Sequence, residues 1–305
     1  MRNNKKINNE YSSADNALLY RREGGAKILF GIIFGFFIIY MLSLILPFVW
    51  VFISSFKDGM EFADITRSPF DLPEKWLFSN WSLCFEVLEI KNTRFIGMIW
   101  NSIWYVVVGG VIGLFFEAAT SYVISKYTQF KISRLMYILV IFFMTFPVMG
   151  KTSAAYKFVY SVGLGDNPLY VVIFSMAGFG TNFLILCASW EGVSNSYAEA
   201  AKIDGAGHYT TFFQIMLPMI KGPLVALGIL AFISRWNQYD KILLYLPSFP
   251  TLATGLYIFQ NVTTRMTNIP VYFCGVLLSI IPTLTIFCIF SDTIMQSVTQ
   301  GGLKG

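Results

Sequence analysis

A polar segment between two long apolar runs carries the residue types and spacing expected of a mechanical contact with a soluble partner. Its characteristic residues are, in chain order, Glu199, Ala200, Ala201, Asp204, Gly205, Ile215, Leu217 and Pro218. A glutamate in the first turn of a helix complements the helix dipole, and two alanines let another surface approach the backbone closely. Aspartate followed by glycine favours a turn, because glycine accepts positive φ. We therefore expect residues 191–221 to form a helix–turn–helix loop that transmits movement; the alternative is an ordinary polar loop.

The same residues predict the local structure of this loop. A short helix is expected over Tyr197–Lys202, with Ser194 or Ser196 capping its N-terminus. A second helical stretch is expected over Ala206–Leu217, and Pro218 should end it or bend it into the next apolar run.

A carboxylate stands inside another apolar run, where a charge is costly and marks a functional residue by default. Glu117 lies nine residues before Lys126, about 13 Å from the end of that helix at 1.5 Å per residue. We expect Glu117 either to line a translocation pathway or to pack at an interface between subunits.

A second cluster, Arg235-Trp236-Asn237, follows a short apolar run. Asparagine can hydrogen-bond sugar hydroxyls, and tryptophan offers a flat apolar face that a pyranose ring can cover. Trp236 and Asn237 are therefore candidates for the same pathway. The alternative is an interfacial anchor, because tryptophan and arginine are enriched at membrane edges.

Patterns for catalysis and for cofactor binding do not emerge from the sequence. His208 is the only histidine, and no cysteine or acidic pattern near it indicates a metal, so we expect a solvated loop position for it. Gly150-Lys151-Thr152 resembles the end of a phosphate-binding loop, but that motif requires glycine where Thr145 stands. We expect no catalytic residue, no metal site and no cofactor in this chain.

The composition is that of an integral membrane protein. Hydrophobic residues make up 55% of the 305 residues and charged residues 13%, about half the charged share of a soluble domain. A helix needs about 20 apolar residues to cross a bilayer. Six candidate spans are Ile28–Phe56, Ile99–Ile124, Leu135–Val148, Leu169–Trp190, Gly222–Trp236 and Val271–Phe290. We expect an all-α membrane protein with one six-helix domain, residues 28–305, a polar N-terminal tail, residues 1–27, and a short C-terminal tail, residues 296–305.

Lysine and arginine near helix ends predict the orientation, because they favour the cytoplasmic side. The N-terminal tail carries Arg2, Lys5, Lys6, Arg21, Arg22 and Lys27. The loop Lys126–Arg134 carries three basic residues and no acidic one. With six spans, both termini and the loop 191–221 are expected in the cytoplasm. The segment Lys57–Phe95 is then external, where it should form short interfacial helices.

The complete pattern of the polar loop resembles the coupling loop, or EAA motif, of binding-protein-dependent ABC importers. Further similarities to the sugar-type, maltose-permease-like subunit with six spans are Asn101-Ser102, Trp236-Asn237, Pro250-Thr251, Gly255-Leu256 and Gly301–Gly305. The resemblance covers roughly residues 28–305. It implies the type I importer permease fold, with the loop from Glu199 to Gly205 docked on an ATPase.

The resemblance also implies the setting of the protein. It indicates a multi-pass subunit of the bacterial cell membrane that pairs with a second, different permease subunit. Two ABC ATPase subunits, which bind ATP and Mg²⁺, and an extracellular solute-binding protein complete the assembly. The solute that it implies is a sugar or an oligosaccharide.

Alternative functions stay open at this point. A permease for peptides, amino acids or polyols would share the coupling loop. A secondary transporter would be expected to show repeated hydropathy patterns and broken helices; no repeat is visible, although the short third and fifth spans suit that class. An integral membrane enzyme would need a cluster of titratable or metal-binding residues at one membrane face, which the isolated Glu117 and His208 do not supply.

Overall fold

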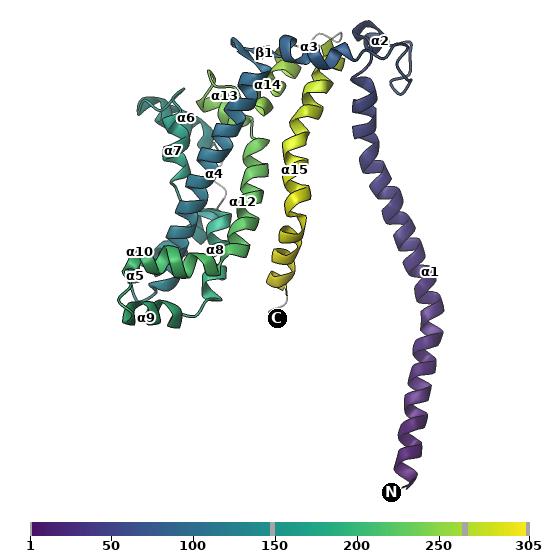
Figure 1. The fold of residues 1–305 in the computed structure, drawn as a ribbon, viewed down its shortest axis with the longest axis vertical. Coiled ribbons are helices and arrows are strands. Elements are labelled where there is room, and N and C mark those ends of the chain that lie inside the picture. Colours follow the sequence, from purple (N-terminus) through teal and green to yellow (C-terminus); the bar gives the residue numbers. More distant parts are fainter. Residues whose placement is uncertain (1, 147–149, 264–267, 303–305) are drawn as a thin grey trace.

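The computed structural model describes residues 2–146, 150–263 and 268–302, which form a helical protein with one small hairpin (Figure 1). The longer helices are α1 (Arg2–Ser54), α4 (Phe95–Lys126), α5 (Lys131–Thr145), α12 (Lys221–Trp236) and α15 (Ile269–Gly302). The shorter ones are α2 (Gly59–Ala63), α3 (Ser79–Val87), α6 (Lys151–Ser161), α7 (Leu169–Ser175), α8 (Thr181–Glu191), α9 (Ser196–Ile203), α10 (His208–Thr210), α11 (Leu217–Met219), α13 (Asp240–Tyr245) and α14 (Leu252–Ile258). Two π-helical turns are η1 (Thr211–Met216) and η2 (Phe259–Thr263).

The helices run between two ends of the molecule. One end carries α2, α3 and the hairpin and is called the outer end; the other carries α9 and is called the coupling end (Figure 1). The start of α1 and the end of α15 both lie toward the coupling end (Figure 1). The hairpin pairs β1 (Glu89–Ile90) with β2 (Thr93–Arg94) through a turn in which Lys91 and Asn92 both have positive φ, as in a type I′ turn.

The expected spans differ in whether the structure forms them as helices long and apolar enough to cross a membrane. Among the described residues, three helices are long and apolar enough to cross a membrane: Lys27–Ser54, Phe95–Lys126 and Ile269–Asp292. A fourth results if the helices His208–Met219 and Lys221–Trp236, which meet at a bend of 80°, count as one span. The expected polar tail, residues 1–27, is helical from Arg2 as the start of α1.

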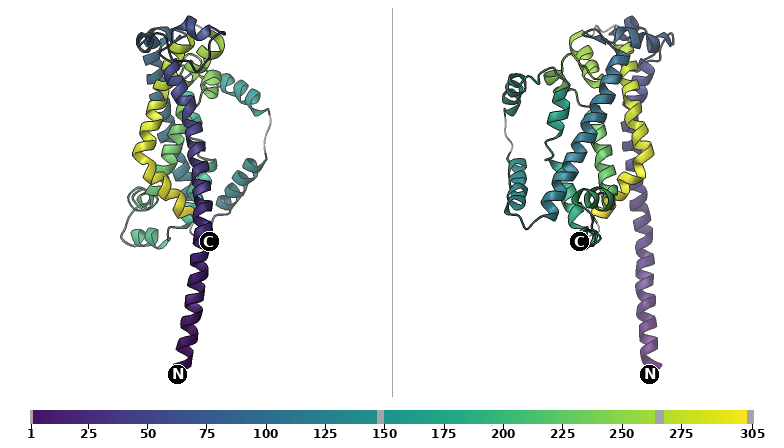
Figure 2. Two further views of the ribbon diagram at one scale, coloured as in Figure 1. Left: turned by 90° about the vertical axis from the view of Figure 1, so that its right-hand side faces the viewer. Right: turned by 60° about the vertical axis from the view of Figure 1, so that its left-hand side comes forward.

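Two expected spans are not single long helices. The third is α5, which has 15 residues and ends at Thr145; Pro147 and Val148 lie outside the described residues. The fourth was expected as one helix over Leu169–Trp190, and this prediction is wrong, because the chain breaks between α7 and α8 where Gly178 and Gly180 have positive φ. Figure 2 shows α5 near the coupling end and α6 near the outer end, both on one side of the remaining helices.

Helix α4 is the central element of the bundle. It packs against α7, α8 and α12, and α12 packs in turn against α15. Two clusters of buried side chains result. An outer cluster joins α4 to α14 and α15 around Phe95, Met98 and Phe259, and an inner cluster joins α4 to α8 and η1 around Tyr122, Trp190 and Met216. α4 therefore contributes to both ends of the core.

Helix α1 stands apart from this bundle. None of the residues in its most apolar membrane window is buried by the rest of the chain, and Figure 1 shows it diverging from α15 toward the coupling end. At the outer end it is held by aromatic contacts: the ring of Trp50 lies 5.5 Å from that of Phe273, and the ring of Phe52 lies 6.4 Å from that of Trp81. The chain is thus anchored at one end of α1 and offers the remaining length to a membrane or a partner.

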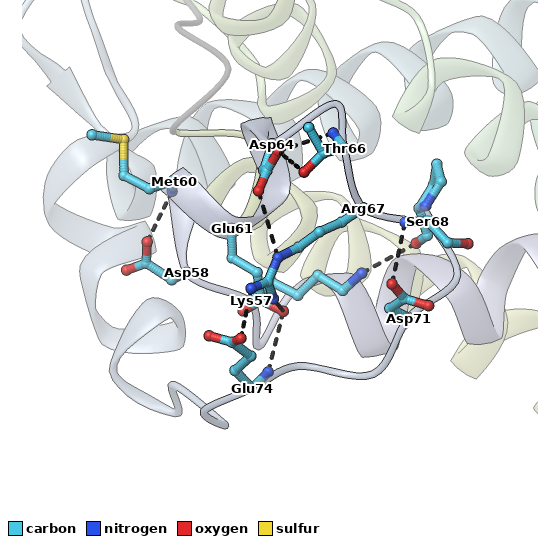
Figure 3. Close-up of polar contacts among 11 residues, drawn as sticks. Lys57, Asp58, Met60, Glu61, Asp64, Thr66, Arg67, Ser68, Asp71 and Glu74 are labelled. Atoms are coloured by element: carbon cyan, nitrogen blue, oxygen red, sulfur yellow. Dashed lines mark hydrogen bonds and ion pairs between the residues drawn. The ribbon is translucent and has the colours of Figure 1, made fainter.

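The segment after α1 contains the short helices α2 and α3, as predicted, and a network of polar contacts holds its first part (Figure 3). Arg67 lies 2.6 Å from Glu74, 3.5 Å from Asp64 and 3.9 Å from Glu61. The hydroxyl and the amide of Thr66 donate hydrogen bonds to Asp64, and these bonds lower the pKa of the Asp64 carboxyl. The network keeps a mainly acidic surface in one conformation.

Asn80 fastens α3 to the end of α1, and its loss should destabilise the outer end. Its buried amide donates 2.9 Å hydrogen bonds to the carbonyls of Ser55 and Lys57. The Asn80→Ala variant leaves both carbonyls without this donor, and each unmade bond to a buried group costs about 1–3 kcal/mol. We expect a lower unfolding temperature in detergent, measured by intrinsic fluorescence.

The matched control for Asn80→Ala is Ser82→Ala. Among the described residues, the Ser82 hydroxyl donates to the Ser79 carbonyl one turn earlier in the same helix and to no other group, so this variant should unfold at nearly the wild-type temperature. Equal unfolding temperatures for wild type and Asn80→Ala would show that α3 is held by other contacts.

Candidate functional site

The polar loop, residues 191–221, folds as predicted into two helical stretches joined by a turn, and is called the coupling segment. Helix α9 covers Ser196–Ile203, one residue longer at each end than expected. Asn195 occupies its N-cap position without a side-chain hydrogen bond. The Ser194 hydroxyl accepts a 3.2 Å hydrogen bond from the amide of Ser196, the first residue of α9, so the expected capping is confirmed for Ser194 and not for Ser196. The two hydroxyls also lie 2.8 Å apart, within hydrogen-bond distance.

The motif residues on α9 divide into an exposed and a buried group. Glu199 and Ala200 are exposed, whereas Ala201 is buried against the rest of the chain. Ile203 is 86% exposed and Tyr197 50% exposed on the same short helix. An isoleucine and a tyrosine at these exposures give α9 an apolar surface beside Glu199 that the described chain does not cover.

The turn after α9 depends on Gly205. Its φ is +81°, and it occupies the C′ position of a helix-terminating motif. The Gly205 amide donates to the Lys202 carbonyl at 3.1 Å, and the Ala206 amide donates to the Ala201 carbonyl at 2.9 Å. These two bonds satisfy carbonyls at the helix end that would otherwise lack partners. Asp204 precedes the turn and is exposed.

The second helical stretch contains a π turn. The chain runs from α10 through η1 to α11 and then bends by 80° into α12 near Ile220, two residues after Pro218, as the sequence predicts. Ile215 is half-buried, and Leu217 packs against the inner cluster. These two motif residues therefore hold the coupling segment to the membrane helices, while Glu199 and Ala200 face outward.

Contacts between aromatic rings connect η1 to α4 and α8. The ring of Phe212 lies 5.0 Å from that of Tyr122 and 6.5 Å from that of Trp190. The Trp190 indole also donates a 3.0 Å hydrogen bond to Ser121 on α4. A displacement of η1 is thus passed directly to both helices, because close-packed interiors transmit strain.

A polar cavity of about 330 Å³ lies farther along α4. Its polar lining comes from Glu117, Asn182, Ser234, Arg235, Gln238 and Lys241. The Asn182 amide donates a 3.1 Å hydrogen bond to the Glu117 carboxylate. Asn182 is placed there because α8 begins directly after the break that follows α7. The structure therefore brings Glu117 together with residues from α8, α12 and α13.

Arg235 reaches this cavity across a groove in α4. An added Cβ at Gly109 would lie 2.5 Å from one guanidinium nitrogen of Arg235, and one at Gly113 would lie 3.1 Å from the other. The guanidinium donates to Ser175 at 3.3 Å and lies 5.9 Å from the centre of the Tyr105 ring. The two glycines thus make room for a cation at membrane depth.

Trp236 and Asn237, the two sequence candidates next to Arg235, both lie outside the cavity lining, one buried and the other exposed. The Trp236 indole is buried between α12 and α15, where it donates to the Ser279 carbonyl at 2.9 Å and stacks on Phe232. The exposed Asn237 side chain donates to the Ile233 carbonyl one turn earlier. Neither residue is among those that line the cavity, whereas their neighbours Arg235 and Gln238 are.

The part of the chain that forms this arrangement matches a known protein family. Residues 109–301 match the family of binding-protein-dependent transport system inner membrane components. The chain belongs to this family. Its matched part begins at the glycine groove of α4 and includes the cavity, the coupling segment and α15.

Individual relatives of this permease are named for sugar transport. It is 27% identical to the diacetylchitobiose uptake system permease protein NgcG of Streptomyces coelicolor, over 88% of this chain and 86% of the relative. It is 25% identical to the arabinooligosaccharides transport system permease protein AraQ of Halalkalibacterium halodurans, over 68% of this chain and 76% of the relative. A chain of a bacterial ABC transporter that imports alginate is similar in fold, with a TM-score of 0.72, 24% identity and coverage of 87% and 96%.

Sequence patterns alone missed several cavity residues of the permease. Asn182 and Gln238 are ordinary polar residues in the sequence, and only the fold brings them to Glu117 and Tyr105; the Tyr105 hydroxyl donates to Gln238 at 2.6 Å. For Asn182 and Gln238 the sequence offered no signal. For the α4 side of the cavity it did: Gly109, Gly113 and Glu117 are four residues apart, which places all three on one face of a helix.

The turn after α9 yields a prediction for the permease. Gly205→Ala should weaken coupling, because a left-handed conformation costs an L-residue roughly 1–2 kcal/mol and nothing within 4 Å of an added methyl group would compensate. We expect fewer solute molecules transported per ATP hydrolysed by the assembled complex in proteoliposomes, with unchanged amounts of this chain in the membrane.

Gly207→Ala is the control in the same turn. Gly207 also has nothing within 4 Å of an added Cβ, but its φ is −69°, so alanine fits without strain. Equal transport per ATP in all three proteins would mean that the turn conformation does not matter for coupling.

Proposed function

We propose that this permease forms half of the translocation pathway for a sugar or oligosaccharide in an ATP-driven importer. The observation that carries this proposal is the polar cavity beside α4 in a chain of the binding-protein-dependent family. The names of relatives such as NgcG and AraQ support the sugar class. Carboxylate, amide and guanidinium groups on one wall are well suited to hydroxyl-rich solutes, since each offers two hydrogen-bonding atoms in one plane.

Within the cavity, Glu117 and Arg235 are the proposed solute contacts. The Glu117 carboxylate keeps acceptor capacity beyond its bond to Asn182, because an ionised carboxylate accepts several hydrogen bonds. No ion pair within 4.0 Å joins Glu117 to Arg235 in the described part of the chain. Trp236 and Asn237 are the sequence candidates for the pathway; we propose that they support it from beside the cavity, by fixing the end of α12.

The partners follow from the two surfaces that the described chain leaves uncovered. We propose that the exposed face of α9, with Glu199, docks on one of two ATPase subunits, which hold ATP and Mg²⁺, while this chain binds no cofactor. We propose that the uncovered length of α1 packs on a second, different permease subunit. The external segments around α13 and α14 then face an extracellular solute-binding protein.

The proposed location is the bacterial cell membrane, with both termini in the cytoplasm. The position of α9 supports this orientation, because it lies at the same end as the start of α1 and the end of α15 (Figure 1). The basic loop Lys126–Arg134 contacts α9 through Tyr127, whose ring lies under the Lys202 ammonium, and basic loops favour the cytoplasmic side.

The assembly is tested by purifying the tagged chain from its native membrane in mild detergent. We expect mass spectrometry to identify an ABC ATPase, a second permease and a solute-binding protein, because α9 and α1 both present uncovered surfaces. Replacing Ile203 with lysine should lower the recovery of the ATPase while leaving the second permease bound. Recovery of the chain alone, or as a homo-oligomer without an ATPase, would contradict the proposal in favour of a secondary transporter.

The pathway is tested with Glu117→Gln, which keeps the size of the side chain and removes its charge. Hydrogen bonds to charged groups contribute about 1.5–3 kcal/mol, so we expect uptake of the preferred solute to fall about tenfold or more. The binding of the ATPase should be unchanged, as judged by co-purification.

Asp292→Asn serves as the control for this substitution, since Asp292 is an exposed carboxylate on α15 that does not line the cavity. It should transport like wild type. If Glu117→Gln equals wild type for every solute tested, Glu117 is a packing residue.

A further inference from the structure

Tyr127 lies at the coupling end of α4, directly after the last residue of that helix, and contacts the coupling segment from outside the family motif. Its hydroxyl lies 3.1 Å from Nδ1 of His208 at the start of α10. The Nζ of Lys202, on α9, lies 6.0 Å from the centre of the Tyr127 ring. One side chain thus touches both helices that flank the Gly205 turn.

Tyr127 and His208 both line an apolar groove of about 500 Å³. One wall of the groove comes from α4 and the start of α5, including Phe115, Val123 and Phe130. The other wall comes from the coupling segment, including Tyr209 and Phe213. The hydroxyl of Tyr127 therefore adds a polar contact between two walls that also meet through apolar contacts such as the stacked rings of Phe115 and Phe213.

Tyr127 is also firmly held on the side of the membrane helices. Its amide donates to the Val123 carbonyl at 3.1 Å, which continues the hydrogen-bond pattern of α4. Its ring lies 6.1 Å from that of Tyr122 in an edge-on arrangement and 6.4 Å from the nearly parallel ring of Phe130. The neighbouring Lys126 ammonium donates to the Val193 carbonyl, which precedes α9. The end of α4 is thus attached to the coupling segment both before and after α9.

We propose that Tyr127 is a positioning residue that conveys the displacement of α9 to α4. This inference rests on the proposed function, because it requires an ATPase that moves α9. The main path from α9 to α4 runs through the Gly205 turn and the π turn η1. The Tyr127–His208 contact bypasses the π turn. The contact between Lys202 and the Tyr127 ring bypasses both turns, because Lys202 precedes Gly205 on α9. Movement that reaches Tyr127 acts along the axis of α4 on Glu117, ten residues earlier and about 15 Å away at 1.5 Å per residue.

The test uses the complete complex, with its ATPases, second permease and binding protein, in proteoliposomes. ATP-dependent uptake by the wild-type complex first tests the proposed function by itself. Tyr127→Phe then removes only the hydroxyl and keeps the ring contacts. We expect solute transported per ATP hydrolysed to fall about fivefold, as for the loss of a single neutral hydrogen bond, while ATP hydrolysis without binding protein is unchanged.

Tyr137→Phe is the matched control, because no hydrogen bond of the Tyr137 hydroxyl, on α5, is found among the described residues. The Tyr137→Phe complex should transport as much solute per ATP hydrolysed as the wild-type complex. His208→Phe should reproduce Tyr127→Phe, and the double variant should show no further loss, because both substitutions remove one contact.

Tyr127→Leu decides the inference, since it removes the hydroxyl and the ring together. If the wild-type complex transports and Tyr127→Leu has the same ratio of solute to ATP, the inference is overturned while the proposed function stands. Additive losses in the Tyr127→Phe, His208→Phe double variant would overturn it as well, because the two side chains would then act separately.

Discussion

Along α4 the side chains that face neighbouring elements change from the smallest to nearly the largest, and the arrangement of the other helices depends on that change. Gly109 and Gly113 leave a groove that the Arg235 guanidinium fills. Two turns later Tyr122 fills the space between α8 and η1 with its ring. Interiors are packed at close to crystal density, so the glycines and Tyr122 could not exchange places. The polar cavity and the inner cluster therefore lie at fixed and separate levels along α4.

Arg235 and Glu117 are partly buried ionisable side chains, and burying a charge costs free energy unless hydrogen-bonding partners compensate it. Arg235 is compensated by the Ser175 hydroxyl and the face of the Tyr105 ring rather than by an acid within 4.0 Å in the described residues. Glu117 is compensated by the Asn182 amide. The break between α7 and α8 helps to place the hydrogen-bonding partner of Glu117. Irregular backbone at this depth is tolerated where it is buried in protein or lines a cavity, and here it starts α8 at the position that brings Asn182 to Glu117.

Local chemistry made part of this structure predictable from the sequence. Gly205 marked the turn because few other residues tolerate its φ, Pro218 marked the bend into α12, and the apolar runs marked α1, α4 and α15. Features that depend on distant residues were not predictable. The pairing of Asn182 with Glu117 spans 65 positions, and that of Tyr105 with Gln238 spans 133. The position of Trp236 beside Ser279 rather than in the cavity depends equally on how α12 rotates against α15.

The π turn η1 gives the interval between Gly205 and Ile215 a geometrical meaning. Each residue of a helix advances its neighbours by about 100° around the axis, and a π turn accommodates one residue more than the α-helix around it. Together, the length of this stretch and its wide turn set the orientation of α9 relative to α12. Nine residues separate Gly205 from Ile215. A deletion or insertion of one residue in their helical part, from His208 on, would turn the exposed face of α9 by more than a quarter of a circle without altering any residue on that face.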